Sequence, residues 1–399
     1  MINPSANGWI EKFFFEQKPL LLPVVVNQDL FYKKVRETGF IYGHIVEFNT
    51  LVEFETKGWL RDEISKVALL NTLFDIYGLT TGENNPELFV EKALAFYNEM
   101  NPQGFNLFRK VLPNSSSSLN LEKIIDERVQ TNIDIISKNF SHIITNALLF
   151  IDVLAFRKYL IHGSIPEKYL KKIEKTITNI VSLALKTKNN KSKYDDLLIK
   201  LFEASVRYSK FSNVSIQNLD ELHLDFFTDK LEKYYFVDMA GMAMWSDGMI
   251  DKKETRFLHH LAHSLHVPDE FVNESIKQTN DFILKYKAEI HYFNYSNPVK
   301  HFYDQTTQSV EVLISRNKKR LLNEISESKE LMILLALSTT RDLDEKEKKK
   351  VKKQLLDICK TIPSLTIFLL PGGSLLLPIL IKFIPKLLPS SFNENLDLE

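Results

Sequence analysis

The chain has 399 residues, which is more than one hydrophobic core usually serves, so we expect two or three domains. Hydrophobic residues make up 44% and charged residues 26%, a composition typical of globular rather than disordered or fibrous proteins. The 51 basic and 51 acidic residues balance, so the net charge gives no argument for a nucleic-acid partner, and we expect no DNA binding. The single cysteine, Cys359, excludes an internal disulfide framework and a cysteine-based zinc site.

Helical periodicity dominates the chain. Apolar residues recur at helical spacing through residues 62–79, 119–160 and 195–211, whereas strand-like alternation is rare and glycine is scarce at 12 residues. The sequence therefore predicts an all-α fold, with residues 19–26 as an ambiguous extended segment. The N-terminus lacks a basic region followed by an apolar run, so we expect no cleavable signal peptide and place most of the chain in the cytoplasm.

Two polar segments divide the predicted helices. Residues 113–120 read as a serine-rich loop, and residues 186–193 read as a solvated link rich in lysine and asparagine. We predict an N-terminal helical region over 1–113, a middle region over 119–220, a third helical unit over 221–335 and a C-terminal tail over 336–399.

An acidic turn in the third unit reads "SDGMID" and is followed by a helix that begins near Glu254. The turn imitates the second half of an EF-hand loop, but counting back from Glu254 puts Ala243 and Trp245 where calcium needs oxygen ligands, which disfavours that site. A capping interpretation is favoured, in which Asp251 caps the helix and Glu254 completes a capping box.

With its flanking helices, the turn resembles the TerB-like helical domain of tellurite-resistance proteins over residues 234–272. The resemblance implies that Asp247, Asp251 and Glu254 are metal ligands, which is the alternative to capping.

A histidine cluster follows the turn, formed by His259, His260, His263 and His266. Histidines four residues apart on a helix are able to share a transition metal, but a solvated polar face is the favoured interpretation.

Motifs for nucleophilic catalysis and for phosphate binding do not occur, and Cys359 reads as a small buried hydrophobe. We therefore expect no enzymatic activity and no cofactor.

A lysine-rich helix is predicted just before the last apolar segment. Asp344 and Glu347 form a plausible N-terminal cap, and Val351, Leu355 and Ile358 have helical spacing. The helix carries six lysines between its cap and its last turn, and they form either a solvated face or a surface for anionic lipid or ribosomal RNA phosphate. These residues are Lys346, Lys348, Lys349, Lys350, Lys352 and Lys353.

The apolar segment after this helix has no charged residue over positions 362–381. Twenty residues would reach about 30 Å as a helix, the thickness of a hydrocarbon core. Recurring prolines and a Gly-Gly pair predict a bent span or a hairpin, and the alternative is a hairpin packed into the protein's own core. The residues of the predicted membrane segment are Ile362, Pro363, Pro371, Gly372, Gly373, Pro378, Lys382, Pro385 and Leu388.

The proline and lysine spacing of the tail, LLP…K..P..LPS.F, resembles the Letm family over residues 339–393. Members of that family are inner-membrane proteins associated with cation/proton exchange and with ribosome binding. Together with the TerB-like unit, the chain resembles bacterial Letm-related proteins described as biofilm-associated. The family tends to carry an acidic residue between two of its prolines, whereas this chain has Gly373 and Ser374, so an exchange pathway lacks an obvious titrating group here.

Three functional hypotheses follow. We favour a non-enzymatic helical protein tethered to the cytoplasmic face of the inner membrane, with membrane lipid as one partner and the ribosome or another protein as a second. The alternatives are a component of a cation/proton pathway and a soluble cytoplasmic scaffold whose acidic turn binds a metal.

Overall fold

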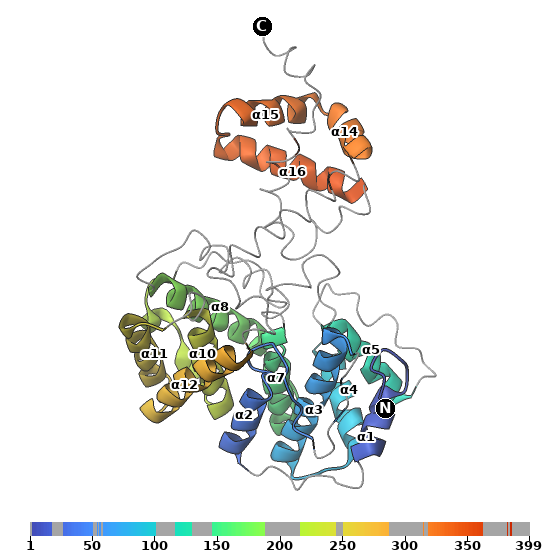
Figure 1. Cartoon of the computed structure of the whole chain (residues 1–399), viewed down its shortest axis with the longest axis vertical. Helices are drawn as coiled ribbons and strands as arrows, with labels where there is room; N and C mark the ends of the chain where they lie inside the picture. Colours follow the sequence, from blue (N-terminus) through green and yellow to red (C-terminus); the bar gives the residue numbers. More distant parts are fainter. Residues whose placement is uncertain are drawn as a thin grey trace, which may run out of the picture.

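The computed structural model describes residues 2–17, 27–50, 54, 56, 59–100, 116–129, 146–187, 216–244, 250–286, 314, 318–361, 381 and 384. These residues form thirteen α-helices and two short 3-10 helices, with no β-strand among them, which confirms the all-α prediction (Figure 1). The α-helices are α1 Trp9–Gln17, α2 Gln28–Glu37, α3 Arg61–Thr81, α4 Pro86–Glu99, α5 Ser117–Val129, α7 Phe150–His162, α8 Tyr169–Thr187, α10 Lys230–Met244, α11 Lys252–Ser264, α12 Asp269–Tyr286, α14 Lys318–Ser326, α15 Lys329–Thr340 and α16 Glu345–Thr361. The 3-10 helices are η3 Leu219–Glu221 and η4 Leu224–Phe226.

Local side-chain chemistry sets several helix ends. The Asn27 side chain accepts a hydrogen bond from the backbone of Asp29 at the start of α2, and Asn85 caps α4 in the same way. Such caps satisfy backbone N–H groups that have no partner inside the helix. At the other end of α3, Gly82 takes a left-handed conformation with φ of 76°, which glycine adopts without a steric penalty.

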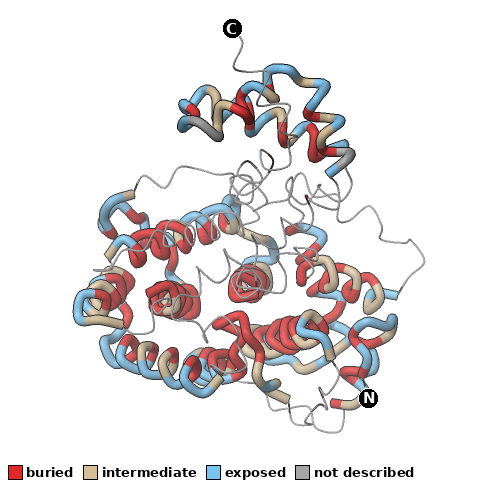
Figure 2. Tube along the Cα trace, turned by 45° about the horizontal axis from the view of Figure 1, so that its top comes forward, coloured by how far each residue is buried: buried red, intermediate tan, exposed pale blue. Residues whose placement is uncertain are grey.

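Two helices are the centres of the main body. The long helix α3 packs against α2, α4, α5 and α7, and α10 packs against α2, α8, α11 and α12. Since α7 contacts both α3 and α8, the two groups share one continuous hydrophobic core. Buried residues line the inward faces of these helices, and exposed residues lie on the outward faces (Figure 2).

Buried ion pairs join helices that are distant in the sequence. Arg128 of α5 pairs with Asp152 of α7, whose carboxylate also accepts a hydrogen bond of 3.2 Å from the hydroxyl of Tyr97. Arg36 of α2 pairs with Asp238 of α10 across 3.1 Å, with both side chains at most 3% exposed. Because a buried charge is costly unless it is paired, these contacts fix which helices lie side by side.

The last three helices, α14, α15 and α16, pack on one another and lie apart from the main body in Figure 1. Val351, Leu355 and Cys359 of α16 are fully buried, as are Leu331 and Leu335 of α15. These side chains form the core of the three-helix unit, and the burial of Val351 and Leu355 confirms the apolar spacing predicted for the lysine-rich helix.

One predicted loop is shorter than expected. The serine-rich segment was predicted as a loop through Asn120, but α5 begins at Ser117. The hydroxyl of Ser116 accepts a hydrogen bond of 3.3 Å from the backbone of Leu119, so serine acts as a helix cap rather than as a continued loop. Residues 19–26 and 195–211 lie outside the described residues, and the predicted domain boundaries stay a prediction.

The buried carboxyl group of Asp75 on α3 should make the stability of the protein depend on pH. Burial raises the pKa of this carboxyl group to about 7, partly offset by the amide of Asn49, which donates a hydrogen bond of 3.0 Å. Between about pH 4 and pH 7 the folded state holds a proton that the unfolded state has released, so the stability contribution falls as the pH rises. Replacing Asp75 with Asn should leave stability near pH 4 unchanged and raise it by about 1–2 kcal/mol at pH 8. Urea unfolding at both pH values checks this, and an Asp75→Asn effect that is equal at the two values contradicts it.

Candidate functional site

The lysine-rich helix α16 begins with a complete capping box. The Asp344 carboxylate accepts hydrogen bonds of 2.8 Å from the backbone of Lys346 and of Glu347, and Glu347 accepts one of 2.8 Å from the backbone of Asp344. Arg341 holds the other side of Glu347 with a bond of 2.7 Å, and these contacts lower the pKa of Glu347 to about 2. The predicted cap is therefore confirmed, and it fixes the start of the helix in the sequence.

Apolar side chains on one face of α16 hold it against the rest of the unit. Val351, Leu355, Ile358 and Cys359 are all buried on that face. Burial raises the pKa of the Cys359 thiol to about 12, so the group is an un-ionised thiol at neutral pH and acts as a small hydrophobe. The other faces of the helix remain for the lysines.

All six predicted lysines are exposed on α16, but two of them are paired with acidic groups. Lys348 pairs with Glu345 one turn earlier at 3.0 Å, and Lys350 pairs with Glu330 of α15 at 2.6 Å. The hydrogen bond from Lys350 lowers the pKa of Glu330, and the reciprocal contact raises the pKa of Lys350. Within the part of the chain that the structure describes, Lys346, Lys349, Lys352 and Lys353 form no ion pair.

Three of these lysines follow one line along the helix. Positions 346, 349 and 353 have the i, i+3, i+7 spacing of one helical face, and this face is opposite to the buried positions of Val351 and Leu355. We call Lys346, Lys349 and Lys353 the lysine stripe. Lys353 also lies near enough to Asp357 to contribute to its lowered pKa, although the main cause of that shift is the hydrogen bond from Lys360. The stripe presents three exposed lysine side chains on one face of α16.

The comparisons with known proteins bear on this helix. A protein-family model described as "LETM1-like, RBD" matches residues 343–399, which include all of α16. Residues 343–399 are therefore similar to a LETM1-like ribosome-binding domain. The lysine stripe lies within the matched region. A search of curated proteins and a search of solved structures found no match.

The predicted membrane segment begins directly after α16. The nine residues named for this segment lie outside the described residues, and between Ile362 and Leu388 the structure describes only Ile381 and Ile384, of which Ile384 is fully buried. Among the helices that the structure describes, none combines the length and the apolar composition needed to cross a bilayer.

The acidic turn of the third unit forms the predicted capping box. The Asp251 carboxylate accepts hydrogen bonds of 2.7 and 2.9 Å from the backbone of Lys253 and of Glu254, and the Glu254 carboxylate accepts one of 2.7 Å from the backbone of Asp251. Glu254 is 2% exposed, so its carboxylate faces the helix end rather than an open site. Asp247 lies outside the described residues.

Three histidines after this turn, His259, His260 and His263, lie on α11, and His266 follows the end of the helix. His260, His263 and His266 are exposed, and His259 lies 2.7 Å from the carboxylate of Asp269. Across the described residues, no group of three or more His, Cys, Asp or Glu side chains converges at a distance that would hold a metal ion.

Removing the cap should separate the capping interpretation from the metal interpretation. Replacing Asp251 with Ala should destabilise the protein by about 1 kcal/mol, since two backbone N–H groups lose their acceptor. Asn at the same position should retain most of the stability because its side-chain oxygen also caps. Thermal unfolding with and without added zinc checks both variants. A metal-dependent rise in melting temperature that is lost in both would contradict a purely capping role.

Sequence reasoning missed two features of these helices. Glu330, which lies 20 residues before its partner Lys350, was not recognised as a counter-ion, and Arg36 was not connected with Asp238. The only sequence signal for the pairing of Arg36 with Asp238 is that both charged residues lie on otherwise apolar helical faces. That signal does not identify which charges are partners.

Proposed function

We propose that this protein is a non-enzymatic, membrane-associated helical protein that recruits ribosomes at the cytoplasmic face of the inner membrane. The match of residues 343–399 to a LETM1-like ribosome-binding domain supports this proposal most directly. Among the described residues of that region, the lysine stripe has the chemistry for ribosomal RNA, because exposed ammonium groups neutralise phosphates and release counterions.

The tethering part of the proposal rests on the sequence. Residues 362–381 carry no charge, and the lysines of α16 come directly before them. A basic flank is attracted to an anionic leaflet, and each lysine near the surface contributes about 1 kcal/mol. The same helix thus has access to both lipid headgroups and RNA phosphate, and the two contacts are separable by experiment.

Two measurements test membrane tethering and ribosome binding separately. Membranes of the native host are washed with alkaline carbonate and compared for the full chain and a version that stops after Thr361. We expect the full chain to stay in the membrane and the shortened version to be released. Release of both would remove the membrane anchor from the proposal.

For the second part, the purified full chain is sedimented with host ribosomes over a series of salt concentrations. We expect co-sedimentation that weakens steeply between about 50 and 200 mM salt. If the chain stays in the supernatant at the lowest salt, the ribosome-recruiting role is wrong, whatever the membrane result.

A further inference from the structure

A pocket of about 580 Å³ lies between α2, α10 and α12 in the main body, and the lysine stripe takes no part in it. Its volume falls in the range of about 300–1,000 Å³ that is usual for small-molecule sites. Which ligand would bind in this pocket depends on how rigid the pocket floor is and on which charged groups line the walls.

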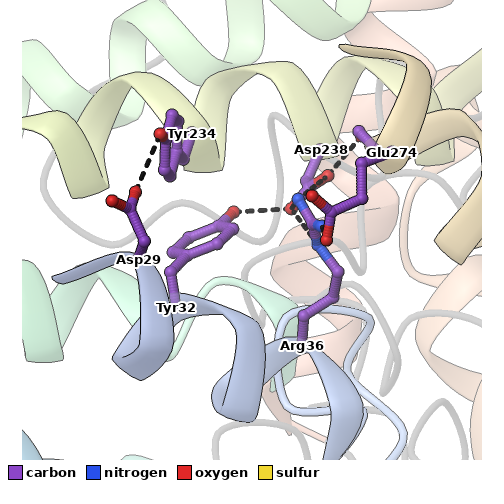
Figure 3. A network of polar contacts seen from close by, with 7 residues as sticks. Asp29, Tyr32, Arg36, Tyr234, Asp238 and Glu274 are labelled. Atoms are coloured by element: carbon purple, nitrogen blue, oxygen red, sulfur yellow. Dashed lines mark hydrogen bonds and ion pairs between the residues drawn. The ribbon is translucent and has the colours of Figure 1, made fainter. Parts of the chain in front are cut away.

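Two residues that form the floor of the pocket, Tyr32 and Arg36, belong to a polar network around Asp238, which lies beneath the lining residues (Figure 3). This carboxylate accepts a hydrogen bond of 2.6 Å from the hydroxyl of Tyr32, a double contact from Arg36 and a further hydrogen bond from the hydroxyl of Ser275. Asp238 is fully buried and Arg36 is 2% exposed. All strong donors and acceptors of the floor are therefore used within the protein, and the floor is a fixed surface rather than a source of free charge.

The aromatic rings that line the pocket, those of Tyr234 and Phe271, also pack against other residues of the protein. The rings of Tyr234 and Phe271 are stacked with centroids 3.7 Å apart, and the guanidinium of Arg36 lies 4.8 Å from the centroid of Phe271. A ligand therefore meets packed ring edges and an apolar surface here, not an empty aromatic cage.

Charged groups around the opening differ in how well they are paired. Asp29 and Lys230 pair with each other at 2.6 Å, and Asp29 also accepts a hydrogen bond from Tyr234. Glu274 reaches only the outer nitrogen of Arg36 at 3.5 Å, and its side chain is 47% exposed. Arg36 is already neutralised by Asp238, so the carboxylate of Glu274 stays largely available.

Two further charges at the opening face solvent without a counter-ion in the described part of the chain: Lys33 on α2 and Glu270 on α12. Glu270 and Glu274 are four residues apart and so share a face of α12. The available positive charge thus lies on one wall and the available negative charges on another. They form no ion pair with each other, although they line the same pocket.

We propose that this pocket binds a zwitterionic small molecule of the amino-acid or short-peptide class. Its carboxylate would contact Lys33, and its ammonium group would contact Glu270 and Glu274. The apolar part of the ligand would lie against Phe271 and against Leu30, which is 47% exposed at the opening. A ligand that carries both charges satisfies both walls at once, whereas a simple cation or anion leaves one wall unsatisfied.

Titration calorimetry with the full-length protein tests this proposal, with L-leucine and leucyl-leucine as the probes. N-acetyl-leucine, which lacks the ammonium group, and leucinamide, which lacks the carboxylate, are the matched ligand controls. We expect saturable binding of at least one probe at concentrations below about 10 mM, and at least fivefold weaker binding of both controls. No saturation by either probe, or equal binding of the blocked analogues, overturns the proposal.

Matched variants locate the binding. Lys33→Met and Glu270→Gln change exposed side chains, so both should fold, and each should weaken the probe about fivefold. Lys12→Met on α1 removes an exposed lysine that does not line the pocket, and this variant should bind as the unaltered protein does. If Lys33→Met binds as tightly as Lys12→Met, or if a polylysine peptide binds and the zwitterions do not, the assignment to this pocket is wrong.

Discussion

Replacing Lys346, Lys349 and Lys353 with Ala should weaken binding of the full chain to ribosomes by roughly tenfold or more at moderate salt. These three side chains are exposed, share one helical face and form no ion pair in the described residues. If each contacts a phosphate, the slope of log affinity against log salt concentration should fall by about 2–3 in magnitude. The change of slope matters most, because it counts the phosphate contacts that the variant has lost.

A second triple variant on the same helix gives a matched control. Lys348, Lys350 and Lys360 are each paired with a carboxylate, namely those of Glu345, Glu330 and Asp357. Replacing these three with Ala removes the same formal charge from α16, but it should change the salt slope much less. Equal losses in the two triple variants would show that net charge rather than the lysine stripe determines binding. Neither variant alters the buried face, so circular dichroism should show the same helix content for both.

Replacing Asp238 with Ala should destabilise the main body by about 3–5 kcal/mol. The substitution leaves Arg36 buried without its main counter-ion and also removes the acceptor for Tyr32 and Ser275. Burial alone would lower the pKa of Arg36, but the attraction of Asp238 raises it above its usual value, so the guanidinium stays charged in the folded state. Urea unfolding followed by circular dichroism measures the loss.

Two control variants distinguish the effect of leaving Arg36 unpaired from the effect of removing one carboxylate side chain. Asp29→Ala removes a carboxylate from an exposed pair with Lys230, and it should cost no more than about 1 kcal/mol. A double variant, Arg36→Met with Asp238→Leu, replaces the pair by apolar side chains and should be more stable than Asp238→Ala alone. A double variant as unstable as the single one would contradict the unpaired-charge explanation.

Local patterns were read correctly from the sequence because their chemistry acts over one or two helical turns. The capping boxes at Asp344 and at Asp251 each depend on a carboxylate three residues later. The buried positions of α16 follow from apolar spacing in the same way. The end of the predicted loop at Asn120 was wrong because serine both breaks and caps helices, and composition alone does not distinguish these roles.

The sequence by itself thus determined the all-α fold, the cap and apolar face of α16, and the resemblance that the family match supports. Only the tertiary structure decided which charges remain available. Lys350 is neutralised by Glu330 on another helix, and Arg36 by Asp238, 202 residues away, so neither pairing leaves a local pattern. The pocket between α2, α10 and α12 arises in the same way, from residues that only packing brings together. Periodicity shows which side chains point inward, but the free energy of a buried or paired charge depends on a partner that the chain reaches only when it folds.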